Sequence, residues 1–260
     1  MTIIALLHYQ PKYYCFLFLN FSYIHTYIHT YTHTHTHTVA VLSAGPVGIG
    51  DGIGYINTTL VSSFCRSDGV LLSPSYSATP LDRMYGIDAP KNGELWQAHS
   101  VIGEGVWMSL LAVDIAMQES VGLQDVWPRL KGQYIYTASL GLAACKNGSA
   151  AAICAHKLSD PAVVTVYTGP AVGVDHAFKL YSLAPVEKNG WALLGEAGPV
   201  VAVSPMRFSS VTATVNGMVV HIIGMAEENV TIVFMTPHST ILTLSVRINT
   251  SGSAVVAVGV

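Results

Sequence analysis

Residues 39–85 read VAVLSAGPVGIGDGIGYINTTLVSSFCRSDGVLLSPSYSATPLDRMY. The stretch opens with a short apolar run, Val39–Leu42, whose length and β-branching predict a buried strand. A glycine-rich loop follows around a single carboxylate, Asp51, and Asn57 then precedes a predicted short helix as its cap. Strand, glycine-rich loop and helix form the unit of an α/β sheet or barrel, in which acidic loop residues lie where ligands bind. The stretch therefore predicts a ligand-facing position for Asp51.

The order of short motifs along this stretch carries a family resemblance. Gly45-Pro46-Val47 is followed by Asp51, then by an Asp-Gly-x-Leu-Leu turn at 68–72 and an Ala-Thr-Pro-x-Asp segment at 78–82. This order resembles the distal part of the raffinose synthase and alkaline α-galactosidase group of glycoside hydrolases. The segment Trp191–Ser210 is similar, more loosely, to the C-terminal β-domain of that group.

The resemblance implies that residues 39–92 are a partial βα remnant that closes a (β/α)8 barrel, with Asp51 facing the sugar pocket as a substrate-binding residue. In that group the nucleophile and the acid/base carboxylates lie on earlier barrel strands, which nothing upstream of Val39 supplies. Glycoside hydrolysis needs two carboxylates facing the scissile bond. Asp68 instead fits a turn before Gly69. Asp82 fits either an ion pair with its neighbour Arg83 or a turn. We therefore expect no catalytic residue in this chain.

The composition is poor in charged residues and rich in Gly, Ser, Thr and Val, which favours β-structure, and its net charge is too small to imply steering of a charged partner. Only 10% of the 260 residues are charged, and the formal net charge is −3. An ordinary globular protein has about 25% charged residues. The sequence has no basic patch of the kind that binds nucleic acid, so we expect no nucleic-acid partner.

Residues 1–38 are predicted to be a disordered low-complexity segment. Tyr23–Thr38 reads YIHTYIHTYTHTHTHT, a repeat that would suit a histidine-rich metal tract but is more typical of a translated dinucleotide repeat. On that interpretation the true coding sequence begins near Val39. The apolar run Tyr13–Ile24 is too short to span a membrane as a helix, so a membrane partner is not expected.

Beyond Tyr85, short apolar runs alternate with turn residues. The two runs within Glu94–Ile115, separated by Gly103-Glu104-Gly105, are predicted as strands rather than a helix because of their Val and Ile content. Trp96 and Trp107 are interpreted as core residues, with sugar stacking as the alternative. The remainder predicts an antiparallel β-sandwich over 93–260. The further predicted strands are Tyr134–Ser139, Ala151–His156, Val163–Tyr167, Ala177–Ser182, Trp191–Leu194, Val200–Val203, Phe208–Val215, Val219–Gly224, Val230–Phe234, Ile241–Ile248 and Ala254–Val258.

Asn216-Gly217 is the clearest hairpin signal, because the pair tolerates the positive φ of a tight turn. The alternation of Val211, Ala213 and Val215 with polar residues predicts that one face of the first strand is buried.

Five Asn-x-Ser/Thr sequons, at Asn20, Asn57, Asn147, Asn229 and Asn249, favour a secretory route. We expect glycosylation at Asn147 and Asn229. Neither the histidines outside the repeat nor the four cysteines have metal-ligand spacing, so no metal site and no cofactor are expected. Cys145 and Cys154, nine residues apart, leave a hairpin disulfide open.

Two functions are therefore expected. The first is the C-terminal portion of a glycoside hydrolase-like protein that acts on α-galactosides or related sugars, inactive by itself. The alternative is a secreted β-rich carbohydrate-binding or structural module without catalysis. In both, carbohydrate is the expected partner.

Overall fold

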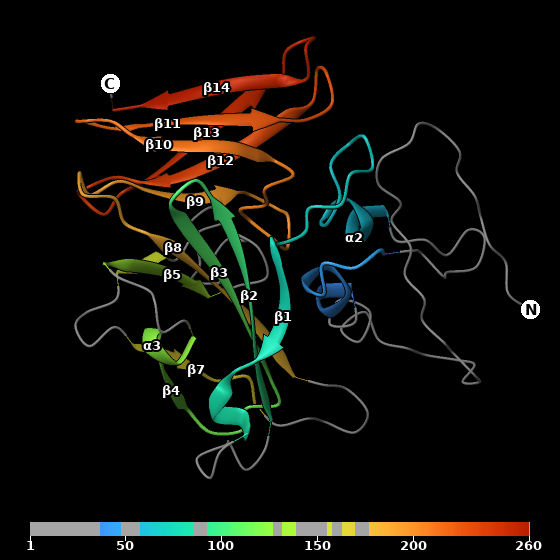
Figure 1. The fold of residues 1–260 in the computed structure, drawn as a ribbon, viewed down its shortest axis with the longest axis vertical. Coiled ribbons are helices and arrows are strands. Elements are labelled where there is room, and N and C mark those ends of the chain that lie inside the picture. Colours follow the sequence, from blue (N-terminus) through green and yellow to red (C-terminus); the bar gives the residue numbers. More distant parts are fainter. Residues whose placement is uncertain are drawn as a thin grey trace, which may run out of the picture.

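A computed structural model describes residues 37–47, 58–85, 93–126, 132–138, 155–157, 163–169 and 177–259. The protein is mainly β, and every strand pair between its named strands is antiparallel (Figure 1). This confirms the prediction that the chain is mainly antiparallel β-structure. Short helical segments lie on both sides of the largest sheet, with α2 on one side and α3 on the other.

The largest sheet has six strands in the order β1-β2-β3-β8-β5-β6. Its central hairpin pairs β2 with β3 in unbroken register around the turn at Gly103, which has a φ of +59°. The prediction of strands rather than a helix is confirmed here. The six strands are β1 (Tyr76–Pro80), β2 (Glu94–Ile102), β3 (Gly105–Val113), β5 (Tyr134–Ala138), β6 (Ala155–Lys157) and β8 (Phe178–Pro185).

Both faces of this sheet are covered. On one face Leu95 and Leu110 are buried in a cluster with residues of the two-stranded sheet of β4 (Glu119–Gly122) and β7 (Val163–Val166) and of helix α3 (Leu123–Val126). On the other face, Leu111 and its neighbours pack against residues 40–47 and 60–71 and against Val200 and Val201.

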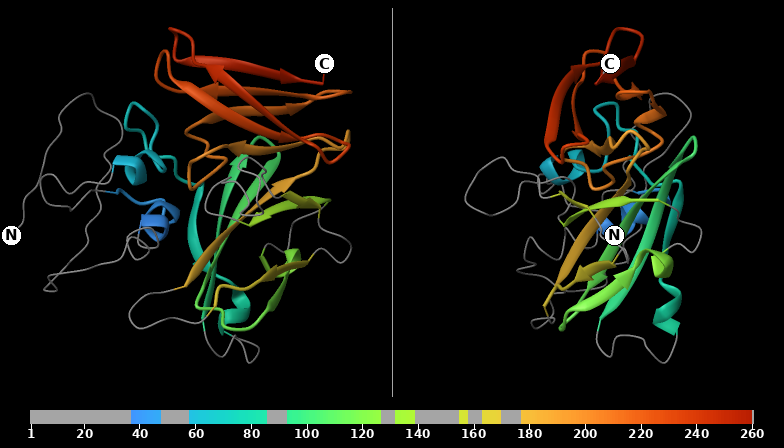
Figure 2. Two further views of the ribbon diagram at one scale, coloured as in Figure 1. Left: turned by 180° about the vertical axis from the view of Figure 1, so that it is seen from behind. Right: turned by 90° about the vertical axis from the view of Figure 1, so that its left-hand side faces the viewer.

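Two three-stranded sheets form the C-terminal part and lie at one end of the six-stranded sheet (Figure 2). Their orders are β10-β11-β14 and β13-β12-β9. Side chains of both sheets, including Val220 and Ile232, are buried in one hydrophobic cluster. The strands are β9 (Ala192–Glu196), β10 (Phe208–Ala213), β11 (Met218–Ile223), β12 (Asn229–Met235), β13 (Ile241–Arg247) and β14 (Ser253–Val258).

The predicted strand Val39–Leu42 is wrong, because residues 37–42 form a helix. Val41 and Leu42 are buried, whereas Val39 is exposed. A short apolar run is compatible with a buried strand and equally with a buried helical turn. Its hydrophobic pattern therefore does not distinguish a strand from a helix. The expected barrel-closing unit therefore lacks its strand in the described residues. The predicted helix after Asn57 is confirmed as α2 (Thr58–Ser62).

The helix over 37–42 also corrects the predicted limit of the low-complexity segment. His37 and Thr38 belong to this helix and are buried, and the His37 ring stacks on Phe64 with 5.6 Å between centroids. The last two residues of the expected disordered segment 1–38 are therefore part of the core. The rest of that segment lies outside the described residues.

Two further predictions in the C-terminal part are wrong. Residues 200–203 form buried bends rather than a strand, and the Ala202 carbonyl accepts a hydrogen bond from the Glu196 amide at 2.7 Å. The buried face of β10 ends early: Val215 is 89% exposed and Ala213 is exposed as well. Val211 is partly buried against the hydrophobic cluster of the two C-terminal sheets, and β10 ends at Ala213, so the predicted alternation does not continue to Val215. The β10–β11 hairpin itself is confirmed.

Candidate functional site

Asp51, the predicted substrate-binding residue, lies outside the described residues, as does Asn57. The segments on either side of this gap are described. Val41 before the gap and Phe64 after it are buried in the same cluster, together with Leu111 and Leu180 of the six-stranded sheet. The chain that flanks Asp51 on both sides is thus anchored to this sheet.

The other two acids of the stretch have structural environments. Asp68 forms an ion pair with Arg66 and accepts a hydrogen bond from the Val70 amide at 3.3 Å, so the predicted turn role is confirmed. Asp82 begins a short 3-10 helix, Asp82–Tyr85, which agrees with a turn role. Its alternative partner Arg83 instead pairs with Glu119 at 3.2 Å.

Both tryptophans considered for sugar stacking are engaged in packing. Trp107 is buried, and its Nε1 donates to the Leu193 carbonyl at 2.8 Å. Trp96 is half-buried against the cluster around Leu111, and its Nε1 donates to Glu94 at 2.8 Å. The interpretation of both as core residues fits these contacts.

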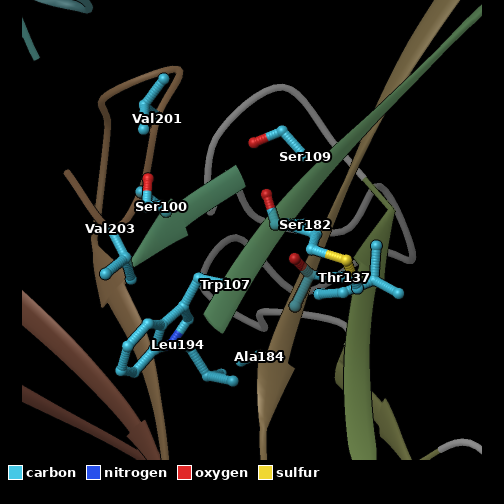
Figure 3. A pocket seen from close by; sticks show the side chains of 12 residues that line it. Ser100, Trp107, Ser109, Thr137, Ser182, Ala184, Leu194, Val201 and Val203 are labelled. Carbon is cyan, nitrogen blue, oxygen red and sulfur yellow. The ribbon is translucent and has the colours of Figure 1, made fainter. Parts of the chain in front are cut away.

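A small cavity lies between the six-stranded sheet and residues 201–203, and a row of hydroxyl groups forms its floor (Figure 3). Ser109 of β3 is the register partner of Ser182 of β8, and Ser182 is the partner of Thr137 of β5. Side chains at paired positions of adjacent strands lie on the same face. The three hydroxyls therefore cross three neighbouring strands side by side.

Two of these hydroxyls lack a hydrogen-bond partner within the described residues, namely Thr137 Oγ1 and Ser182 Oγ. A buried hydroxyl without a partner costs stability. The cavity leaves about 20 Å³ for the centre of a water molecule, which is enough for one ordered water. None of the described residues that line it carries a carboxylate. The cavity is suited to a water molecule and is too small for a sugar ring.

The strongest electrostatic feature of the described chain is a buried arginine between two carboxylates, which we call the Arg207 cluster (Arg207, Glu196 and Glu228). The Arg207 side chain is 1% exposed, against 11% for Glu196 and 7% for Glu228. Arg207 Nε donates to Glu196 at 2.7 Å, and its two terminal nitrogens donate to Glu228 at 2.9 and 2.8 Å. Arg207 also donates to the Ile223 carbonyl at 3.1 Å.

The two carboxyl groups of the Arg207 cluster differ in acidity. Burial raises the pKa of Glu196 in spite of the neighbouring Arg207. Burial also acts to raise the pKa of Glu228, but the hydrogen bonds and charge of Arg207, with the amides of Ser67 and Met225, outweigh it and lower this pKa to about 2. An acid and a base with separated pKa values are typical of glycosidases. Here both carboxylates bind the same guanidinium, so the arrangement is suited to holding segments together.

The Arg207 cluster links the N-terminal stretch to the C-terminal sheets. The Ser67 hydroxyl donates to Glu228 at 3.0 Å, and Arg66 donates to the Met206 carbonyl at 2.7 Å. Sequence reasoning missed this cluster because its members are far apart in the chain. One signal was present: Glu196 is a lone charge within the apolar run Trp191–Val203.

Among the described residues, no group of three or more His, Cys, Asp or Glu side chains could hold a metal ion. No helix in the described part of the chain has the length and apolar character to cross a membrane. Of the two favoured glycosylation sites, Asn147 lies outside the described residues and Asn229 is exposed at the start of β12.

Comparison with known proteins gives no family for this chain. No protein-family model matches it, and no curated protein matches it.

Proposed function

We propose that this chain is a non-catalytic, β-rich part of a glycoside hydrolase-like protein that acts on α-galactosides or related sugars, and that it holds carbohydrate without cleaving it. The observation that carries the proposal is the state of the buried acids. Glu196 and Glu228 both bind Arg207, and the described cavity has no carboxylate in its lining. A glycosidase needs two carboxylates that face a sugar.

We further propose that the two C-terminal sheets form a β-sandwich, as expected for the β-domain of such proteins. Support comes from the hydrophobic cluster to which both sheets contribute, with Val220 of β11 and Phe234 of β12 among its buried members. Two antiparallel sheets that bury one common core are the defining feature of that architecture.

Asp51 is the proposed sugar-binding residue, because a carboxylate on a glycine-rich loop can accept charged hydrogen bonds from sugar hydroxyls. The test is calorimetric titration of the full chain with raffinose and with methyl α-galactoside. Saturable heat is expected, and Asp51→Asn should abolish it. Asp82→Asn is the matched control, since Asp82 is an exposed acid of the same stretch and its substitution should leave binding unchanged.

A self-contained structural module is the second candidate. It is favoured by the packing of residues 40–47 and 60–71 onto the six-stranded sheet, because Val41, Phe64 and Leu111 share one cluster. A folded chain that gives no heat with either sugar would support this candidate and contradict the first.

A further inference from the structure

The turn between β13 and β14 carries a sequon in an accessible position. Asn249, Thr250 and Ser251 form the sequence Asn-Thr-Ser, and all three residues are exposed. The Gly252 amide donates to the Asn249 carbonyl at 3.0 Å, and Gly252 has a φ of +77°. This is a tight turn with Asn at its first position and Gly at its fourth, as turn preferences predict. The turn joins one C-terminal sheet to the other. In Figure 1 it is the loop that leads into β14.

Hydrogen bonds converge on the side-chain oxygen of Asn249. Its Oδ1 accepts from the Ser251 hydroxyl at 2.6 Å, from the Ser251 amide at 3.0 Å and from the Ser253 amide at 3.1 Å. Donors at the carbonyl oxygen withdraw electron density from the amide, which makes the Nδ2 protons more acidic. The hydroxyl that the sequon requires therefore contacts the amide that would react.

We propose that Asn249 is an acceptor of an N-linked glycan. In this reaction Nδ2 forms a bond to the anomeric carbon of a polyprenyl-pyrophosphate-linked oligosaccharide. The bond from that carbon to the pyrophosphate oxygen breaks, polyprenyl pyrophosphate leaves with the bonding electron pair, and Nδ2 releases one proton to the solvent. The step involves no oxidation or reduction. A glycan at this exposed turn extends into solvent and leaves the shared core of the two sheets untouched.

The other described sequon is in a more constrained position. Asn229 is the first residue of β12, where it pairs with Arg247 of β13, and its hydroxyl residue, Thr231, lies within the strand. Strand β12 is the central strand of its sheet. Asn249 and Ser251 instead lie wholly in a turn, so a bound glycan disturbs no strand pairing there.

The test expresses the full chain behind a cleavable signal sequence in eukaryotic cells, with one reporter sequon appended after Val260. Only chains that carry a glycan at the reporter are selected, so that every scored chain has entered the lumen. Enzymatic glycan removal converts each occupied Asn to Asp, and peptide mass spectrometry locates it. Asn249 is expected to be converted. Asn249→Gln and Ser251→Ala should each remove one glycan, and Ser251→Thr should restore it.

Two controls preserve the sequon. Thr250→Ala changes its tolerant middle position, and Asn216→Gln changes an exposed turn Asn that has no Ser or Thr two residues later. Both should keep the glycan at Asn249. An unmodified Asn249 on reporter-positive chains would overturn the proposal, and so would loss of its glycan in either control.

Discussion

Replacement of Arg207 by Met tests how much the Arg207 cluster contributes to the stability of the fold. The side chain is 1% exposed, and it donates to Glu196, Glu228 and the Ile223 carbonyl. Met fills a similar volume but leaves two largely buried carboxylates without their cation. Removal of one partner from a buried ion pair costs roughly 3–5 kcal/mol. We therefore expect a loss of about 4 kcal/mol in the free energy of unfolding.

The assay is urea unfolding followed by circular dichroism, with the denaturation midpoint and slope compared between variants. Arg247→Met is the matched control, because Arg247 pairs with Glu227 at the surface, where the two side chains are 67% and 51% exposed. An exposed pair is worth at most about 1 kcal/mol. A second test adds Glu196→Met and Glu228→Gln to Arg207→Met, and this triple variant should regain most of the lost stability, since no buried charge remains.

A loss below about 1 kcal/mol for Arg207→Met would refute the reasoning, because that is the value expected of an exposed pair. A triple variant no more stable than Arg207→Met would also contradict it, since the cost would then not come from unpaired carboxylates.

Four further substitutions test the Arg207 cluster, the cavity and the contact at Gly195. The pKa of Glu228 lies near 2, below its ordinary value. The ionised group therefore stabilises the fold above about pH 4.5, and this contribution of at most about 3 kcal/mol is lost as the pH falls towards 2. Glu228→Gln should flatten this part of the curve of unfolding free energy against pH, and an unchanged slope would count against the prediction. Thr137→Val and Ser182→Ala each remove a buried hydroxyl that has no partner in the described residues. Thermal unfolding should therefore show a stability that is unchanged or raised by up to about 1 kcal/mol. A clear loss of stability would point to a polar contact that these hydroxyls need. Gly195→Ala should cost about 2 kcal/mol in urea unfolding, because Gly195 has a φ of +117° and an added Cβ would lie 2.3 Å from the Ala202 carbonyl oxygen; a neutral effect would show that the backbone there moves aside.

The sequence predicted most of the strands because their signals are local. The runs around Gly103 and around Asn216-Gly217 combine β-branched residues with turn residues, and both hairpins are present. Gly103 has a positive φ, whereas neither Asn216 nor Gly217 has one, so the second hairpin forms without the conformation on which its prediction depended. Val200–Val203 has the same apolar composition but is not a strand. Its Ala202 carbonyl approaches Gly195 closely, a contact between two segments that composition alone does not encode.

The helix at 37–42 and the Arg207 cluster lay beyond prediction for different reasons. Val39–Leu42 is too short for its period to separate a strand from a helical turn. Glu196, Arg207 and Glu228 meet only after the sheets have formed, since they belong to β9, the segment before β10 and the turn before β12. Long-range pairing of charges requires the fold to be known first.

The proposed function includes the proposal that this chain does not cleave glycosides. Its most direct test is the release of the aryl group from an aryl α-galactoside by the purified full chain, measured beside the Asp51→Asn variant. We predict that both proteins leave the substrate intact at every pH tested. Turnover by the natural chain that disappears in Asp51→Asn would contradict the account, because that loop would then belong to a working catalytic centre.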